Sequence, residues 1–206
     1  MPRSVSTAHR QRERQRIAQE AARLIRESGI NDFDHALRKA ATRLGVFDEA
    51  GWPRHAQIEE ALREQQRLFD PVAQPQALRR RREAAVQAMH FLHAFQPRLA
   101  GAVLGGSADG NSPVTLHLHC DDAEAVPHFL HEQGIPATEH SRSMRTGAQR
   151  TPGRYPCWEF SADGIAFELV VLPEQALRLP PLSGDDGKPL ARASVAQVQR
   201  LLVEET

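Results

Sequence analysis

One group of side chains with the types and spacing for chemistry is a set of arginines in a stretch rich in Arg and Gly. Arg142, Arg145, Arg150 and Arg154 all lie between residues 141 and 154. Guanidinium groups bind phosphate oxygens in pairs, so neighbouring arginines can clamp a phosphate. The same composition is equally typical of a mobile surface loop. We therefore expect a loop over residues 141–154 that either clamps a phosphate, with Arg142 and Arg145 as the first candidates, or is simply exposed on the surface.

A second group is the pair His117 and His119, which alternates with apolar residues in the run Val114 to Cys120. Two imidazoles could hold Zn²⁺ or another transition metal, but two ligands on one strand are too few alone. Asp121 could join them as a third metal ligand. It also stands where it could cap a helix, with Glu124 three residues further on. The alternative is an ordinary strand surface that binds no metal.

The elements that must position these residues are those of a mixed α/β domain. Alternating or apolar runs predict strands at Ala102–Leu104, Val114–Cys120, Tyr155–Ser161 and Ile165–Leu172. Asp163 and Gly164, between the last two runs, are typical of a hairpin turn. One helix is expected after Asp121, and a final one begins near Ser194. The fold class is therefore α/β (α+β), with a small mixed sheet and helices on one side.

The first 70 residues predict three short amphipathic helices, because apolar residues such as Ile17, Ala21 and Leu24 recur at helical spacing. The stretch Asp70–Gln76 contains two prolines and predicts a linker. We therefore expect a helical module over residues 1–74 and an α/β domain over residues 75–206. The next helix opens with Arg79 to Arg82, a run typical of a solvated helix start, although four arginines could also contact phosphate.

The order of strand, Gly-Ser turn, strand and helix resembles the first elements of the fold of the nucleotidyltransferase superfamily. The resemblance covers roughly residues 85–172. In that superfamily the turn holds a nucleotide triphosphate, while an Asp-x-Asp pair on the second strand and a third acid on a later strand bind two metal ions. The resemblance implies that Gly105, Gly106 and Ser107 contact the phosphates and that Glu168 is the third, catalytic acid.

The Asp-x-Asp pair itself is missing in either alignment with the family. One alignment places Pro113 and Thr115 at the carboxylate positions and leaves a full strand after them. The other places His117 and His119 there, and almost no strand then remains before Asp121. Mg²⁺ prefers oxygen ligands, above all carboxylates, and neither pair supplies them. We favour the first alignment, in which the frame of the family is kept and its metal site is lost.

Composition limits the class of protein. Charged residues make up 25% and hydrophobic residues 40%, which suits a soluble globular chain. The net charge of zero hides a split, because residues 1–82 carry 17 Arg and Lys against 11 Asp and Glu. This basic excess permits an RNA contact or attraction to the acidic remainder. No apolar run approaches the roughly 20 residues that cross a bilayer. We expect a cytoplasmic protein, away from membranes, whose two cysteines are free thiols.

These observations lead us to expect a catalytically degenerate nucleotidyltransferase-like protein that binds a nucleotide or an RNA phosphate, or that has a regulatory role. An alternative is an active transferase that uses Mg²⁺ or Mn²⁺ at an unusual site, made by Glu168 with Asp109, Asp121 or the two histidines. A third is an interaction module whose helical residues 1–74 dock a protein partner. Whether the chain is an enzyme is left open, and the sequence identifies neither ligand nor cofactor.

Overall fold

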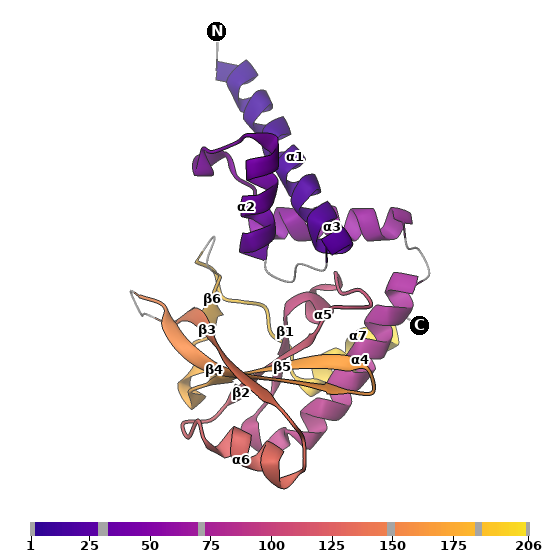
Figure 1. The fold of residues 1–206 in the computed structure, drawn as a ribbon, viewed down its shortest axis with the longest axis vertical. Helices are drawn as coiled ribbons and strands as arrows, with labels where there is room; N and C mark the ends of the chain where they lie inside the picture. Colours follow the sequence, from indigo (N-terminus) through magenta and orange to yellow (C-terminus); the bar gives the residue numbers. More distant parts are fainter. Residues whose placement is uncertain (1–2, 29–32, 70–72, 148–150, 184–186, 205–206) are drawn as a thin grey trace. The chain divides into compact units, whose positions relative to one another are not determined.

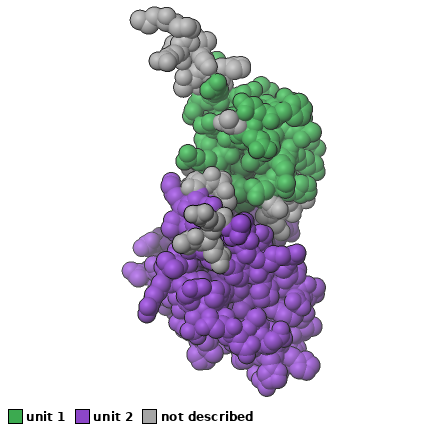
Figure 2. Space-filling view, turned by 90° about the vertical axis from the view of Figure 1, so that its left-hand side faces the viewer, with its two compact units in different colours: residues 1–74 green, residues 75–206 purple. Residues whose placement is uncertain are grey.

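The computed structural model describes residues 3–28, 33–69, 73–147, 151–183 and 187–204. Contacts between residues divide the chain into two compact units, residues 1–74 and residues 75–206, which Figure 2 colours separately. Each unit has a hydrophobic core of its own. Among the described helices, none combines the length and the apolar composition that crossing a membrane requires.

Within the described residues, Figure 1 shows helices first and a mixture of strands and helices afterwards. The α-helices are α1 (Arg3–Ser28), α2 (Phe33–Leu44), α3 (His55–Phe69), α4 (Ala73–Phe91), α5 (Gly101–Gly105), α6 (Ala125–Glu132) and α7 (Val195–Glu204). The strands are β1 (Arg98–Ala100), β2 (Val114–His119), β3 (Thr138–Thr146), β4 (Gly153–Ala162), β5 (Ile165–Leu172) and β6 (Pro181–Leu182). Short 3₁₀ turns are η1 (Glu49–Gly51), η2 (His93–Phe95) and η3 (Glu174–Leu177).

The unit formed by residues 1–74 contains helices α1, α2 and α3. Their apolar stripes meet in one core, in which Ile17, Ala21, Ala36 and Ile58 are fully buried. Helical spacing of apolar residues is what places these side chains on one face of each helix. The predicted helices at the N-terminal end of the chain are therefore confirmed.

The unit formed by residues 75–206 is built on a sheet with the strand order β1-β2-β5-β4-β3-β6. Strands β2 and β5 run parallel, and the other neighbouring pairs run antiparallel. The predicted α/β class with a small mixed sheet is confirmed. The predicted hairpin joins β4 to β5, and its turn residues Asp163 and Gly164 have φ values of 51° and 73°, as a tight two-residue turn requires.

The main core of this unit lies between one face of the sheet and the helices α4, α6 and α7. From β2 it takes Val114, Leu116 and Leu118, and from β5 it takes every second residue from Ile165 to Val171. Because side chains alternate along a strand, the residues between these point to the opposite face. Thr115, His117 and Glu168 therefore share that second face.

The first strand and the helix after it differ from the sequence prediction. Residues Ala102–Leu104 were expected to be a strand, but they lie in helix α5, and strand β1 ends at Ala100. Gly101, with a φ of 69°, makes the sharp change of direction between them, which residues with a side chain rarely adopt. A Cβ at this position would also lie 3.4 Å from Thr115 Oγ1.

The expected loop over residues 141–154 is also wrong. Residues up to Thr146 belong to strand β3, and strand β4 begins at Gly153. Strand β3 has little apolar alternation, because most of its side chains are exposed and its place is fixed by backbone pairing with β4 from Thr138 to Met144. Arg150 lies outside the described residues.

Residues 73–76 of the expected linker are helical. Helix α4 begins at Ala73 and therefore includes Pro75, which a first helical turn tolerates because its backbone N–H would lack a partner in any case. The rest of the expected linker, residues 70–72, lies outside the described residues. The boundary between the two units falls inside this helical start, at residues 74 and 75.

Candidate functional site

Strand pairing gathers the polar side chains on the sheet face that is turned away from helix α4. We call this the polar sheet face, and its residues are Thr115, His117, His140, Arg142, Cys157, Glu159 and Glu168. Along one row across the sheet, Thr115 is opposite Glu168, and Glu168 is opposite Glu159. Cys157 is opposite His140 in the pairing of β4 with β3.

Glu168 is the centre of the polar sheet face. Its carboxylate accepts a hydrogen bond of 3.0 Å from the Thr115 hydroxyl, through Oε2. Arg142 Nη1 lies 2.9 Å from Oε1 and 2.8 Å from Oε2, so one guanidinium nitrogen contacts both oxygens. The Glu168 side chain is only 12% exposed. A largely buried carboxylate is thus held and neutralised by a neighbouring cation.

This arrangement bears on the alignment favoured from the sequence. Thr115, at one of the two missing carboxylate positions, lies in register with Glu168, the residue that resembles the third acid. A hydroxyl and a guanidinium therefore surround Glu168 where the family resemblance implies two more carboxylates. A hard ion such as Mg²⁺ would find one carboxylate, already paired with Arg142, and a neutral hydroxyl.

The structure does not bring His117, His119 and Asp121 together as a metal site. Within the described residues, their ligand atoms do not fall within 4.8 Å of one another. His119 Nδ1 donates to the Gln96 carbonyl at 2.8 Å, and its Nε2 accepts from Arg192 Nη1 at 3.0 Å. Both ring nitrogens are thus used within the protein, which fixes the neutral tautomer.

Burial keeps both histidines of β2 uncharged. Burial, with a smaller contribution from the positive charge of Arg192, lowers the pKa of His117 to about 3. Burial lowers the pKa of His119 to about 4, although its bond to Gln96 acts in the opposite direction. His117 Nδ1 is buried and has no hydrogen-bond partner among the described residues. These histidines are part of the packed interior and are not a strand surface open to solvent.

Asp121 has a structural role that differs from the expected helix cap. Its Oδ1 accepts a hydrogen bond of 3.0 Å from the backbone N–H of Glu174, which ties the end of β2 to η3. Helix α6 instead begins after Glu124, which makes no side-chain cap. Asp122 Oδ1 accepts from the Glu124 N–H at 3.0 Å, so the neighbouring aspartate organises the approach to the helix.

The Gly-Ser turn closes helix α5. Gly106 adopts a φ of 83°, and the backbone N–H groups of Gly106 and Ser107 both donate to the Ala102 carbonyl, at 2.9 and 3.1 Å. Gly105 is the last residue of the helix, and Ser107 is only 1% exposed. These two amide groups are therefore used by the helix end, as in other glycine-terminated helices. The predicted phosphate contact of the turn stays a prediction.

Two buried arginines of helix α4 hold the turn and the loop after it, which corrects the expected solvated run for Arg81 and Arg82, whereas Arg79 and Arg80 are exposed. Arg82 Nε donates to the Val103 carbonyl at 3.0 Å, and its Nη2 donates to Leu104 at 3.2 Å. Arg81 donates to the carbonyls of Ser112, at 2.8 Å, and of Gly110. Both side chains are 5% exposed. Arg81 and Arg82 lie three and four residues after the buried Leu78 and so share its face of the helix. Helical spacing is therefore the sequence signal from which their burial could be predicted.

Asp109, an alternative metal ligand in the sequence analysis, is part of the same loop. Its Oδ1 accepts from the backbone N–H groups of Asn111 and Ser112, at 2.9 and 3.0 Å, and from the Ser112 hydroxyl at 2.8 Å. An aspartate that folds its own loop in this way is a common turn device. It does not belong to the group of candidate metal ligands around Glu168.

The two arginines predicted to bind phosphate do not converge. Arg142 and Arg145 both lie in β3, but residues three apart in a strand point to opposite faces of the sheet. Arg142 belongs to the polar sheet face through its bonds to Glu168. Arg145 is opposite Leu182 in β6.

A group that the sequence analysis missed is formed by His140, Cys157 and Glu168. One ligand atom from each residue lies within 4.8 Å of the others. Burial, with a smaller contribution from the charge of Glu168, raises the pKa of the Cys157 thiol to about 12. His140 could not be placed from the sequence because its strand lacks a hydrophobic pattern. Cys157 and Cys120 are both free, as expected.

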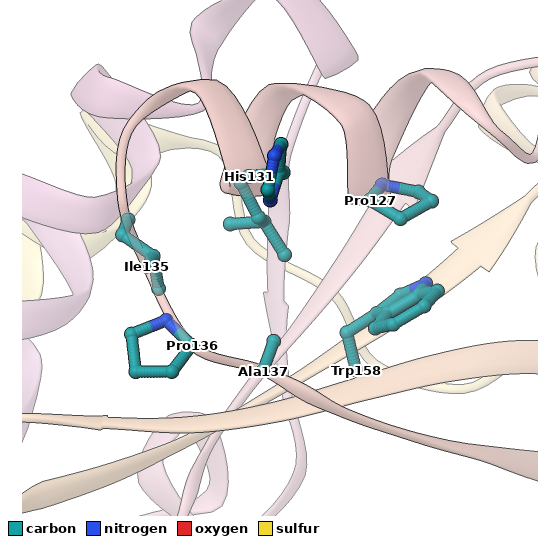
Figure 3. Close-up of a pocket in the computed structure, with 7 residues that line it drawn as sticks. Pro127, His131, Ile135, Pro136, Ala137 and Trp158 are labelled. Carbon is teal, nitrogen blue, oxygen red and sulfur yellow. The ribbon is translucent and has the colours of Figure 1, made fainter.

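A separate pocket of about 280 Å³ lies between helix α6 and strand β4 (Figure 3). Pro127 and His131 enter it from the helix, Pro136 and Ala137 from the following segment, and Trp158 from the strand. None of the predicted site residues lines it. Trp158 belongs to the core face, so the pocket and the polar sheet face lie on opposite sides of the sheet.

Comparison with known proteins found no relative of this chain. No family model matches the chain, and neither a curated protein nor a solved structure matches it. Any assignment of function must therefore come from the residues of the chain itself.

Proposed function

We propose that this chain is a catalytically degenerate nucleotidyltransferase-like protein that binds a phosphate-bearing ligand, a nucleotide or an RNA phosphate, on the polar sheet face. The observation that carries the proposal is the contact of Arg142 and Thr115 with Glu168. These two side chains supply a cation and a hydroxyl to the one acid that resembles the family's metal ligands. The charge that Mg²⁺ would provide at this place is then provided by the protein itself.

Arg142 is the residue through which we expect the phosphate to bind. A guanidinium has five N–H donors, and both bonds to Glu168 come from the same nitrogen, Nη1. The side chain is 49% exposed, so an anion can reach it from solvent. Gly106 and Ser107 contribute less in this proposal, because their backbone amides already bond to Ala102.

Nucleoside triphosphates should raise the melting temperature of the full chain without Mg²⁺ or Mn²⁺. A ligand that binds only the folded state stabilises it by about 2.7 kcal/mol at 100 times its dissociation constant. Arg142→Ala should abolish the shift, whereas Arg145→Ala, on the opposite face of β3, should leave it unchanged. The measurement is a thermal-shift titration with each of the four triphosphates and with a short RNA, with and without metal.

Two results would contradict this proposal. A shift that requires Mg²⁺ or Mn²⁺, together with release of pyrophosphate that Glu168→Gln abolishes, would restore the active transferase. A chain that responds to none of these ligands would remove the binding function. A partner lost on deleting residues 1–74 would then favour the interaction module.

A further inference from the structure

We propose that His140, Cys157 and Glu168 form a binding site for a transition-metal ion, for which Zn²⁺ is the best match. The three residues come from the adjacent strands β3, β4 and β5. They offer an imidazole nitrogen, a sulfur and a carboxylate oxygen, which is a donor set found in zinc sites. The inference rests on this cluster alone and is independent of the nucleotidyltransferase resemblance.

The distances suit zinc coordination. The ligand atoms lie within 4.8 Å of one another, and His140 Nε2 is 3.8 Å from Glu168 Oε1. Zinc bonds are about 2.0–2.3 Å long, so two ligands at the tetrahedral angle lie about 3.4–3.6 Å apart. Side-chain movements of about 1 Å would therefore bring the three donors to coordination distance.

The strands fix the donors in place before an ion arrives. Cys157 is fully buried, and backbone pairing sets it directly opposite His140. Glu168 is oriented by Thr115 and Arg142. The Thr115 hydroxyl and Arg142 both bond to Oε2, whereas Oε1, the oxygen nearest to His140, accepts from Arg142 alone and keeps a second lone pair for an ion. Outer residues that hold a ligating carboxylate in this way raise the affinity of a site for its metal.

The charges of the polar sheet face also suit a divalent ion. Glu159 lies opposite Glu168 on the neighbouring strand, and its Oε1 is 3.7 Å from His140 Nε2. Two carboxylates against the single guanidinium of Arg142 leave one negative charge. On binding, the Cys157 thiol gives up its proton to solvent and its sulfur bonds to the ion. The thiolate, the two carboxylates, Arg142 and Zn²⁺ then sum to zero.

The donors select the kind of metal and leave one position open. Sulfur and imidazole nitrogen suit Zn²⁺ and similar ions, whereas Mg²⁺ prefers oxygen alone. A fourth ligand can be the exposed carboxylate of Glu159 or a water molecule, as in zinc sites that keep a position open to substrate. The site therefore differs in chemistry from the magnesium site that the family resemblance implies.

The test is metal binding by the full chain after treatment with a chelator. Calorimetry with Zn²⁺ should show one ion per chain. Co²⁺ should give the charge-transfer absorption of a thiolate bond and the strong visible bands of a four-coordinate ion. His140→Gln and Cys157→Ser should each weaken Zn²⁺ binding by at least about 100-fold, and Thr115→Val by about 10-fold, as expected for an outer residue.

Cys120→Ser and His128→Gln are the matched controls and should bind Zn²⁺ like the original chain. The Cys120 thiol donates to the Asp122 carbonyl, and His128 pairs with Glu132 on helix α6. Absence of Zn²⁺ binding, or binding that His140→Gln leaves unchanged, would overturn the proposal. Cys157 is buried, so Cys157→Ser could fail to fold. His140 is 34% exposed, so His140→Gln should fold normally and can test the site by itself. No nucleotide is used, so failure here leaves the proposed function untouched.

Discussion

Lowering the pH from 7.5 to 5.0 should reduce the free energy of unfolding of the unit formed by residues 75–206 by about 4 kcal/mol. The cause is the burial of His117 and His119, whose pKa values in the folded chain are about 3 and about 4. A histidine in the unfolded chain titrates near 6.5, so a pH of 5.0 lies about 1.5 units below that value. At about 1.4 kcal/mol per unit, each histidine then accounts for about 2 kcal/mol.

The sign follows from where the protons bind. Between pH 6.5 and the folded pKa values, the unfolded chain carries a proton on each imidazole and the folded chain does not. Acid therefore favours the unfolded state in this range. The full stability is present above about pH 6.5, and the loss ends once the folded histidines themselves bind protons, near pH 4 for His119 and near pH 3 for His117.

The measurement needs a signal from one unit only. The chain has two tryptophans, and Trp52 lies in residues 1–74 whereas Trp158 lies in β4. In a Trp52→Phe chain, the fluorescence of Trp158 reports unfolding of residues 75–206 by urea at each pH. His117→Leu is the control, because it removes a buried Nδ1 without a hydrogen-bond partner among the described residues. It should change stability little at pH 7.5 and halve the pH dependence. An unchanged pH dependence in this variant would contradict the assignment.

The sequence predicted the parts of the fold that depend on local patterns. Apolar residues at helical spacing predicted the N-terminal helices, and the Asp163-Gly164 turn predicted the pairing of β4 with β5. Strand β3 was missed because its backbone is placed by β4 and its exposed side chains carry no alternation. The short strand before Gly101 was misplaced because its three residues are too few to show a period.

The candidate site was predictable only in part, for a related reason. Thr115 and Glu168 could be paired from the family resemblance, which aligns their strands. Arg142 lies in the expected loop of residues 141–154, and His140 comes just before it, where the sequence predicts no strand. Neither the neutralising contact with Glu168 nor the cluster with Cys157 could therefore be foreseen. The histidines of β2 alternate as predicted, but the segments that cover them lie far along the chain, near Gln96 and Arg192. Burial by segments that are distant in the sequence cannot be recognised from the residues around the histidines.

Arg81→Ala should lower the free energy of unfolding of residues 75–206 by about 3 kcal/mol, because its hydrogen bonds, each worth about 1.5–3 kcal/mol from a charged group, exceed the cost of burying the guanidinium. The buried guanidinium donates to the carbonyls of Ser112, Gly110 and Ala77, and all three lose a donor in the variant. Burial also lowers the pKa of Arg81, because removing the charged guanidinium from water costs free energy that its hydrogen bonds must offset. The measurement is urea unfolding with Trp158 as the reporter.

Arg79→Ala is the matched control on the same helix. Arg79 is exposed and pairs with Glu83 four residues on, a contact that is worth about 0.3–0.5 kcal/mol. A loss in Arg81→Ala no larger than this would mean that the arginine does not hold the loop.

Nucleotide binding by the Arg81→Ala chain gives a second comparison. If the arginines of α4 served to bind phosphate, Arg81→Ala would weaken nucleotide binding directly. A role in holding residues 110–112 instead predicts weaker binding only near conditions where the chain unfolds, whereas Arg142→Ala abolishes binding in a stable chain.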